Sequence, residues 1–258
     1  MATTITLTSD LGQRDPSVAR LKGSLLTLAP DANVLDLSHD IPPFSVTEGA
    51  LFLHGALPHF PEGTVHVVGV GAGPRPLAAQ FRGQTILCPD NGLLTLLDLF
   101  DGIGEVRELP LDDSLRDRER QVLFTREVFA PAAASLARGE ALTDLGPPVE
   151  DWQRLDIAQP SVESRKIEGR IIHVDHFGNV VTNILPEHLD GKSVDRIASG
   201  HFTVQELHRS YTDVAKGKPL ALIGQSGFLE LAYNGKHANE IMKLTPGFLV
   251  TVFLSEAS

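Results

Sequence analysis

The chain has 258 residues, which fits one large or two modest domains, and we expect two. Its net charge of -11 and pI of about 5.3 exclude nucleic acid as the main partner, because no basic surface is available to neutralise phosphates. No apolar run reaches the roughly 18 residues of a membrane span, so we expect no membrane partner. The single cysteine, Cys88, and the lack of a leader pattern predict a cytoplasmic protein without disulfides.

From residue 1 to about residue 150, short β-branched runs alternate with longer helical runs. We expect strands over residues 5–8, 33–37, 64–70 and 85–88, and helices over 16–28, 46–59 and 127–138. This alternation is typical of the α/β class, with helices covering a sheet. The pattern predicts an N-terminal α/β domain over residues 1–160, with a largely parallel central sheet flanked by helices.

Residues 145–160 combine prolines and acidic residues with little periodicity, which indicates a connector between domains. Beyond it, β-rich runs are separated by Gly, Asn and Asp turns, at residues 169–174, 180–184, 201–207, 219–223, 228–232 and 248–254. Short strands at such spacing favour a small barrel or sandwich. We therefore expect a smaller C-terminal all-β, barrel-like domain over residues 161–258.

The end of the first strand carries the first candidate site residues, Asp10, Asp15 and Ser17. Open α/β sheets bind ligands at the carboxyl ends of their strands, and a carboxylate there suits a vicinal diol such as that of a ribose. Two alternatives remain open. Asp15 precedes Pro16 and is a good cap for the helix that follows, and Asp10 is equally typical of a turn or helix start.

Four other patterns give weak or no indications of chemistry. The glycine-rich residues 68–76 match neither GxGxxG nor a Walker A motif, and residues 224–227 are one position short of a GxSxG elbow. The segment from Asp175 to Asn179 reads as a hairpin turn as well as a ligand site. The histidines lack metal-ligand spacing, so we assign no metal.

Five segments together resemble the S-adenosylmethionine (SAM) hydroxide adenosyltransferase family, which also contains the fluorinase and chlorinase enzymes. They occur in the family's order over nearly the whole chain, at residues 60–66, 89–94, 129–133, 174–184 and 226–232, in addition to the first fifty residues. The resemblance implies a homotrimer whose pockets lie between the N-terminal domain of one subunit and the C-terminal domain of its neighbour. It implies SAM or adenosine as the small-molecule ligand.

In the N-terminal half, the resemblance implies that Asp10 holds the ribose hydroxyls of SAM. Asp15 and Ser17 match a segment that holds the methionine end. Phe44 corresponds to an aromatic residue beside the ligand in several family members, although a core aromatic following Pro42-Pro43 is an equally good interpretation.

In the C-terminal half, the resemblance gives ligand contacts to Asp175 and Asn179. Gln225 and Ser226 align with residues near the methionine carboxylate, although halogenating members have an arginine where Ser226 stands. The adenine contacts align with the segment Tyr233, Asn234 and Gly235.

The chain departs from the family at the positions of the family's catalytic residues. Gly69 stands at the place of a catalytic aspartate, in a loop about two residues shorter, and Arg75 aligns with the arginine grouped with that aspartate. Halogenating members have a tyrosine at the position of Gly69. Thr125 replaces a histidine or the glycine after it; its hydroxyl would orient a water molecule or an anion but is too weakly acidic to act as a base. Alternatively, Thr125 is a loop residue and Arg126 a surface cation.

The resemblance therefore implies a SAM hydrolase, in which water displaces methionine at the ribose C5′ to give adenosine and L-methionine. Such a nucleophilic substitution depends on positioning and desolvation and needs no cofactor. We expect Arg75 and Thr125 to orient the water. Two alternatives stay open: a non-catalytic SAM- or adenosine-binding protein, and an adenosyltransferase that uses an anion, since Gly69 removes a repelling charge.

Overall fold

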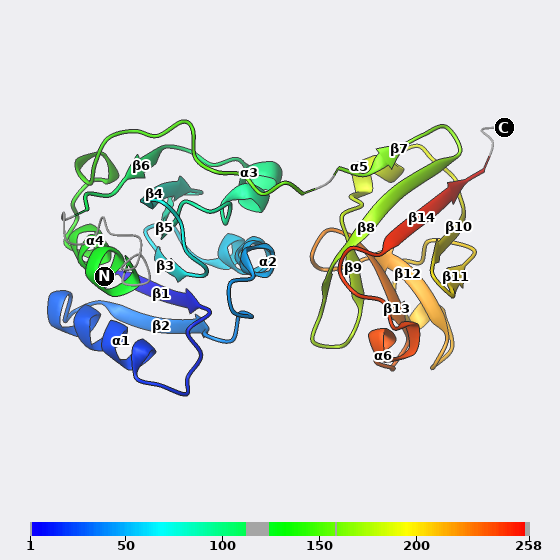
Figure 1. Ribbon diagram of the computed structural model, residues 1–258, viewed down its shortest axis with the longest axis horizontal. Coiled ribbons are helices and arrows are strands. Elements are labelled where there is room, and N and C mark those ends of the chain that lie inside the picture. The colour runs from blue at the N-terminus through cyan, green and yellow to red at the C-terminus, as the bar shows by residue number, and fades with distance from the viewer. Residues whose placement is uncertain (1, 112–123, 158, 256–258) are drawn as a thin grey trace. The chain divides into compact units, whose positions relative to one another are not determined.

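The computed structural model describes residues 2–111, 124–157 and 159–255 (Figure 1). The chain divides into two compact units, Met1–Leu155 and Asp156–Ser258. The sequence prediction placed the domain boundary near residue 160.

The first unit contains a six-stranded sheet of order β2-β1-β3-β5-β4-β6. Its strands are β1 (Thr4–Ser9), β2 (Asn33–Ser38), β3 (Val65–Gly69), β4 (Pro76–Phe81), β5 (Gln84–Pro89) and β6 (Val106–Glu108). Strand β1 runs parallel to β2 and β3, and β3 runs parallel to β5, whereas β4 is antiparallel to β5 and β6. The predicted largely parallel sheet is confirmed.

Strands β4 and β6 of this sheet were not predicted from the sequence. The β4 sequence begins with proline and is rich in alanine, so it lacks the β-branched run typical of a strand. It joins β5 through a two-residue hairpin turn in which Arg82 and Gly83 both have positive φ, 47° and 72°. Arginine is unusual at that position, where Asn or Asp normally marks the turn.

Helices cover the sheet: α1 (Ser17–Leu28), α2 (Val46–Ala56), α3 (Thr95–Asp101) and α4 (Ala130–Ala137), with 3₁₀ turns at Leu57–His59 and Leu142–Asp144. The two faces of the sheet bury alternate side chains. In β5, Leu87 faces the cluster that includes Leu25 of α1, whereas Ile86 and Cys88 face the cluster that includes Leu53 of α2. The helix predicted from residue 127 is preceded by a π-helical turn, η4 (Thr125–Phe129).

The strand order of the sheet reverses between β1 and β3. Chain order proceeds from β1 outward to β2 on one side and from β3 to β5 on the other. In the parallel register Ser9 pairs with Gly69, so Asp10 and Val70 follow directly at the carboxyl ends of these strands. This is the crevice at which open α/β sheets bind ligands.

The second unit is an antiparallel sheet of order β11-β10-β14-β8-β9-β13-β12, with β7 paired to β8. Its strands are β7 (Ser161–Val162), β8 (Lys166–Val174), β9 (Val180–Thr182), β10 (Val194–Ser199), β11 (Phe202–Val204), β12 (Pro219–Ile223), β13 (Leu229–Tyr233) and β14 (Leu249–Leu254). Short helices are α5 (Pro186–Leu189), α6 (Ala238–Met242) and the 3₁₀ turn η6 (Tyr211–Asp213). The end strands β11 and β12 contact each other, so the predicted barrel-like fold is confirmed.

The barrel encloses its own apolar core, built from residues such as Ile167, Leu231 and Val250. Strand β10 was not predicted, because its exposed Asp195 and Arg196 interrupt the apolar pattern. Among the described residues, no helix has the length and apolarity needed to cross a membrane.

Candidate functional site

A cavity of about 280 Å³ lies at the carboxyl ends of β1 and β3, and we call it the N-terminal cavity. Its walls include six of the residues predicted from sequence: Asp10, Asp15, Ser17, Phe44, Gly69 and Thr125. Gly71 and the aromatic residues Phe124 and Phe129 also line it and were not predicted. These residues come from four separate parts of the first unit.

Asp10 is fixed by two backbone amides. Its Oδ2 atom accepts hydrogen bonds from the amides of Phe44 at 2.8 Å and Gly71 at 3.0 Å, while no described residue donates to Oδ1. Phe44 is 78% exposed and has a φ of 63°, a conformation that bulky residues rarely adopt. The alternative of a core aromatic is therefore wrong for Phe44. Asp10 therefore anchors two loops through one of its carboxylate oxygens.

Asp15 combines the two roles that the sequence left open. Its Oδ1 accepts a hydrogen bond of 3.0 Å from the amide of Ser17, the first residue of α1. The hydroxyl and the amide of Ser17 lower the pKa of this exposed carboxyl group, so it is ionised at neutral pH. Asp15 thus accepts a hydrogen bond at the start of α1, and the residue also lines the cavity.

Gly69 and Thr125 fit together. A Cβ atom added at Gly69 would overlap the Cγ2 methyl of Thr125 and lie 3.5 Å from its Cβ and Oγ1 atoms. Thr125 is only 8% exposed and begins the π-helical turn, an irregularity often found at functional sites. Thr125 is therefore a buried cavity residue. Arg126 is a half-exposed surface cation paired with Glu127, as the alternative interpretation expected.

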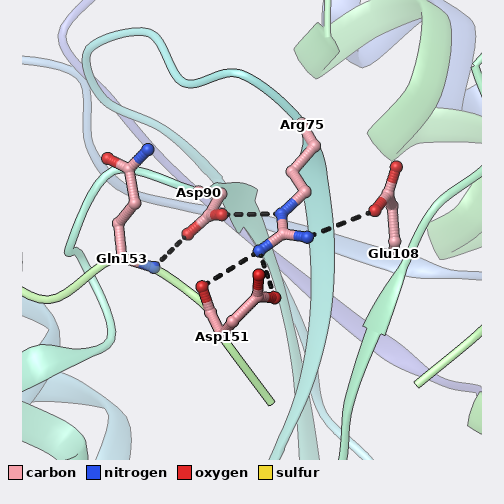
Figure 2. A network of polar contacts seen from close by, with 5 residues as sticks. All are labelled: Arg75, Asp90, Glu108, Asp151 and Gln153. Carbon is pink, nitrogen blue, oxygen red and sulfur yellow. Dashed lines mark hydrogen bonds and ion pairs between the residues drawn. The ribbon is translucent and has the colours of Figure 1, made fainter. Parts of the chain in front are cut away.

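Arg75 does not line the cavity. Figure 2 shows the polar contacts that its guanidinium makes instead. Its Nε donates to Asp90 at 2.7 Å, its Nη2 donates to the Asp151 carboxylate at 2.8 Å, and Nη1 lies 3.5 Å from Glu108. Asp90 is 2% exposed and also accepts from the amide of Gln153 at 2.6 Å. The hydrogen bonds to Asp90 and Asp151 raise the pKa of the guanidinium.

This network corrects the prediction that Arg75 orients a water molecule. Arg75 pairs with three carboxylates and also donates to the carbonyl oxygen of Asp151 at 3.1 Å, so the side chain fastens this segment to the edge of the sheet. Its role is structural.

A second cavity, of about 590 Å³, lies in the second unit, and we call it the C-terminal cavity. The predicted residues that line it are Asp175, Asn179, Gln225, Tyr233 and Gly235. Residues that were not predicted complete it: His176, Phe177, Tyr211, Glu230, Lys236 and His237. Phe177 is exposed, as Phe44 is in the other cavity.

Two predicted residues of this region point elsewhere. The hydroxyl of Ser226 donates to Glu230 at 2.9 Å, and the Nδ2 of Asn234 donates to the carbonyl of Val214 at 2.8 Å. Neither residue lines the cavity. Both belong to its supporting structure.

A continuous network of polar side chains runs along the C-terminal cavity. Asn179 donates from Nδ2 to Asp175 at 3.0 Å and to the Tyr211 hydroxyl at 3.3 Å. Tyr211 donates to Glu230 at 3.0 Å, and Ser226 donates to the other oxygen of the same carboxyl group. Burial raises the pKa of both Glu230 and Tyr211. The hairpin at residues 175–179 is therefore part of the polar wall of the cavity as well as a turn.

Comparison with known proteins assigns both halves of the chain. The N-terminal domain model of the SAM hydroxide adenosyltransferases matches residues 5–146, and the corresponding C-terminal domain model matches residues 169–251. The chain belongs to the SAM hydroxide adenosyltransferase family. Each matched domain of this adenosyltransferase family member carries one of the two cavities.

Named relatives match this family member over nearly its full length. A protein of Thermus thermophilus named (R)-S-adenosyl-L-methionine hydrolase is 37% identical, with 94% of this chain and 96% of the relative covered. A fluorinase of Actinoplanes is 29% identical, with 96% of each chain covered. A solved structure of an uncharacterized conserved protein from Thermotoga maritima has a TM-score of 0.80 at 28% identity, covering 96% of this chain and 99% of that chain.

Proposed function

We propose that this family member is a SAM hydrolase, in which water displaces methionine at C5′ of the ribose to give adenosine and L-methionine. The observation that carries the proposal is the N-terminal cavity, where Asp10 is held by two amides and shares the walls with Asp15, Ser17 and Thr125. Three relatives that are 35–37% identical over 94% of this chain carry the hydrolase name.

The reaction depends mainly on the alignment of the attacking water with the C5′–S bond. The water oxygen forms a bond to C5′ as the C5′–S bond breaks, and the sulfonium leaves as the neutral thioether of methionine while one proton is released. Because the leaving group is already good, positioning the nucleophile opposite the C–S bond supplies much of the rate, and no cofactor is required.

The residues of the N-terminal cavity fit distinct parts of this task. We assign the ribose hydroxyls to the free oxygen of Asp10 and the methionine end to Asp15 and Ser17. Thr125 presents a hydroxyl that both accepts and donates hydrogen bonds, which suits the orientation of water. Its pKa is far too high for it to remove the proton, so we expect the proton to pass to solvent or to a cavity carboxylate.

A non-catalytic SAM- or adenosine-binding protein is the second candidate. It is favoured by the contact between Gly69 and Thr125, because Thr125 occupies the space that a side chain at position 69 would need. A chain built in this way has no room for the aspartate that other family members carry in the loop. Binding without turnover would leave the contacts of Asp10 unchanged.

We also propose that the active form is a cytoplasmic homotrimer, with each binding site completed by the C-terminal cavity of a neighbouring subunit. The proposal is supported by the distribution of predicted ligand residues over both cavities. Light scattering would detect the trimer. A monomer that binds ligand with full affinity would contradict this assembly.

The experiment that separates these functions is incubation of the purified protein with SAM, with and without chloride, followed by chromatography with mass detection. A hydrolase forms adenosine and methionine in both samples, and Asp10→Ala abolishes the products. Formation of 5′-chloroadenosine only with chloride would indicate an anion-using adenosyltransferase. SAM bound but unchanged would favour the binding protein.

Thr125 offers a matched pair of variants. Thr125→Ser keeps the hydroxyl, whereas Thr125→Val keeps the shape and removes it. If the hydroxyl orients water, Thr125→Ser retains most of the turnover and Thr125→Val loses at least about tenfold. Equal activity in the two variants would remove Thr125 from the mechanism.

A further inference from the structure

We propose that Tyr211 and Glu230 are positioning residues that fix the side-chain amide of Asn179, so that its Oδ1 atom accepts a hydrogen bond from the ligand and selects ligands that donate one. This inference rests on the proposed function, because it takes an adenosyl group as the occupant of the C-terminal cavity.

The orientation of the Asn179 amide follows from its partners. One Nδ2 hydrogen goes to Asp175 Oδ2 at 3.0 Å and the other to the Tyr211 hydroxyl at 3.3 Å. The Asp175 carboxylate oxygen accepts this hydrogen bond, so the nitrogen and not the oxygen of the amide faces Asp175. No described residue donates to the Oδ1 of Asn179, although the residue is only 6% exposed and lines the cavity.

A side-chain carbonyl oxygen of a cavity residue that has no protein donor is available to accept a hydrogen bond from a ligand. A ligand that places an acceptor at the same point would leave two oxygens facing each other. The cavity therefore discriminates by the direction of one hydrogen bond, provided that the amide cannot rotate.

Tyr211 adds to the restraint that Asp175 places on this rotation, but only while its own proton points away from Asn179. A phenol hydroxyl can donate or accept, and here its proton goes to Glu230 Oε2 at 3.0 Å, which leaves the oxygen to accept from Asn179. Without an acceptor at position 230, the hydroxyl is free to turn its proton toward the amide. Glu230 thus acts on Asn179 through Tyr211.

Glu230 is itself held firmly. It is 5% exposed, and the Ser226 hydroxyl donates to its Oε1 at 2.9 Å. A Cβ atom added at Gly224 would overlap the Glu230 carboxyl group, so a glycine is needed there to leave room for it. These contacts hold the Glu230 carboxyl group where it accepts the proton of Tyr211.

Two groups of an adenosyl ligand are candidates for the donor: the exocyclic amine of adenine and a ribose hydroxyl. Inosine replaces the amine by a carbonyl oxygen, and 2′-deoxyadenosine and 3′-deoxyadenosine each lack one hydroxyl. Comparing adenosine with these three nucleosides therefore identifies the donor. A site built around one buried hydrogen bond rejects the analogue that lacks the donor strongly.

The test is calorimetric titration of the full-length chain with the four nucleosides. For the wild-type protein we expect tight binding of adenosine and at least tenfold weaker binding of one analogue. Tyr211→Phe should raise the Kd of adenosine about tenfold and leave the Kd of that analogue nearly unchanged, so the discrimination is lost. Glu230→Leu should reproduce this loss independently of Tyr211→Phe.

The control variants distinguish positioning from folding. Glu230→Gln keeps an oxygen that accepts from Tyr211 and should restore the discrimination, and Thr203→Ala, which removes an exposed hydroxyl of β11, should change nothing. A purely structural role would raise the Kd of all nucleosides equally in the positioning variants, and that result, or unchanged discrimination, overturns the proposal. If the wild-type protein binds none of the four, the proposed function itself is wrong and this inference falls with it.

Discussion

The contact between Gly69 and Thr125 predicts that Gly69→Ala destabilises the protein and that Thr125→Ser relieves the damage. The added methyl would overlap the Cγ2 methyl of Thr125, which sits in a largely buried position. Overpacking of this kind typically costs about 1–3 kcal/mol of unfolding free energy. Glycine is required here by space, since its φ is not among the positive values.

Thr125→Ser removes the methyl that would be in the way. The remaining Cβ and Oγ1 atoms lie 3.5 Å from the added Cβ, which is ordinary van der Waals contact. Alone, Thr125→Ser loses one buried methyl and should cost about 1 kcal/mol. The double variant should be about as stable as Thr125→Ser, so the two changes couple by about 1–3 kcal/mol.

Urea unfolding of the wild type, the two single variants and the double variant measures this coupling directly. Gly55→Ala is the control, because a Cβ atom there meets nothing within 4 Å and the site lies within α2; we expect it to stabilise slightly. Additive effects of the two changes at positions 69 and 125 would refute the argument that one side chain fills the space of the other.

Three further changes test other parts of the structure. His66 is buried, which lowers its pKa to about 4, so below about pH 6.5 the unfolded chain binds more protons than the folded chain. The unfolding free energy should therefore fall by about 2 kcal/mol between pH 7.5 and pH 5. In urea titrations at these two pH values, His66→Gln should lack this component of the pH dependence. Arg75→Gln leaves the buried Asp90 without its cation and should cost about 3–5 kcal/mol in the same assay; a loss below 1 kcal/mol would contradict the structural role. Gly224→Ala should displace Glu230 and weaken adenosine binding at least about fivefold in calorimetry, and unchanged affinity would show that the carboxyl group moves freely.

The fold was predictable where local pattern and tertiary context agree. The alternating run at Thr4–Ser9 and the helix at Ser17–Leu28 were found because their apolar spacing matches the faces that they bury. Strand β4 was missed because its alanines bury a face without β-branched side chains. Its strand conformation depends on pairing with β5 and β6, which no local pattern reveals.

The site was predictable to the extent that it sits on strand ends and turns. Asp10 follows from the rule for open α/β sheets, whereas Tyr211 and Glu230 meet only because the barrel brings η6 beside β13. Glu230 carried a weak indication, a charge within an otherwise apolar strand. Arg75 was misplaced because its partner Asp151 lies in a stretch that reads as a connector.

The most direct test of SAM hydrolysis is a single reaction in water enriched in ¹⁸O. If water attacks C5′ and displaces methionine, the heavy oxygen appears in the 5′-hydroxyl of adenosine, in proportion to enzyme, and methionine forms in equal amount without label. Asp10→Ala should give neither product. Intact SAM after prolonged incubation, or adenosine without the heavy oxygen, would contradict displacement at C5′ by water.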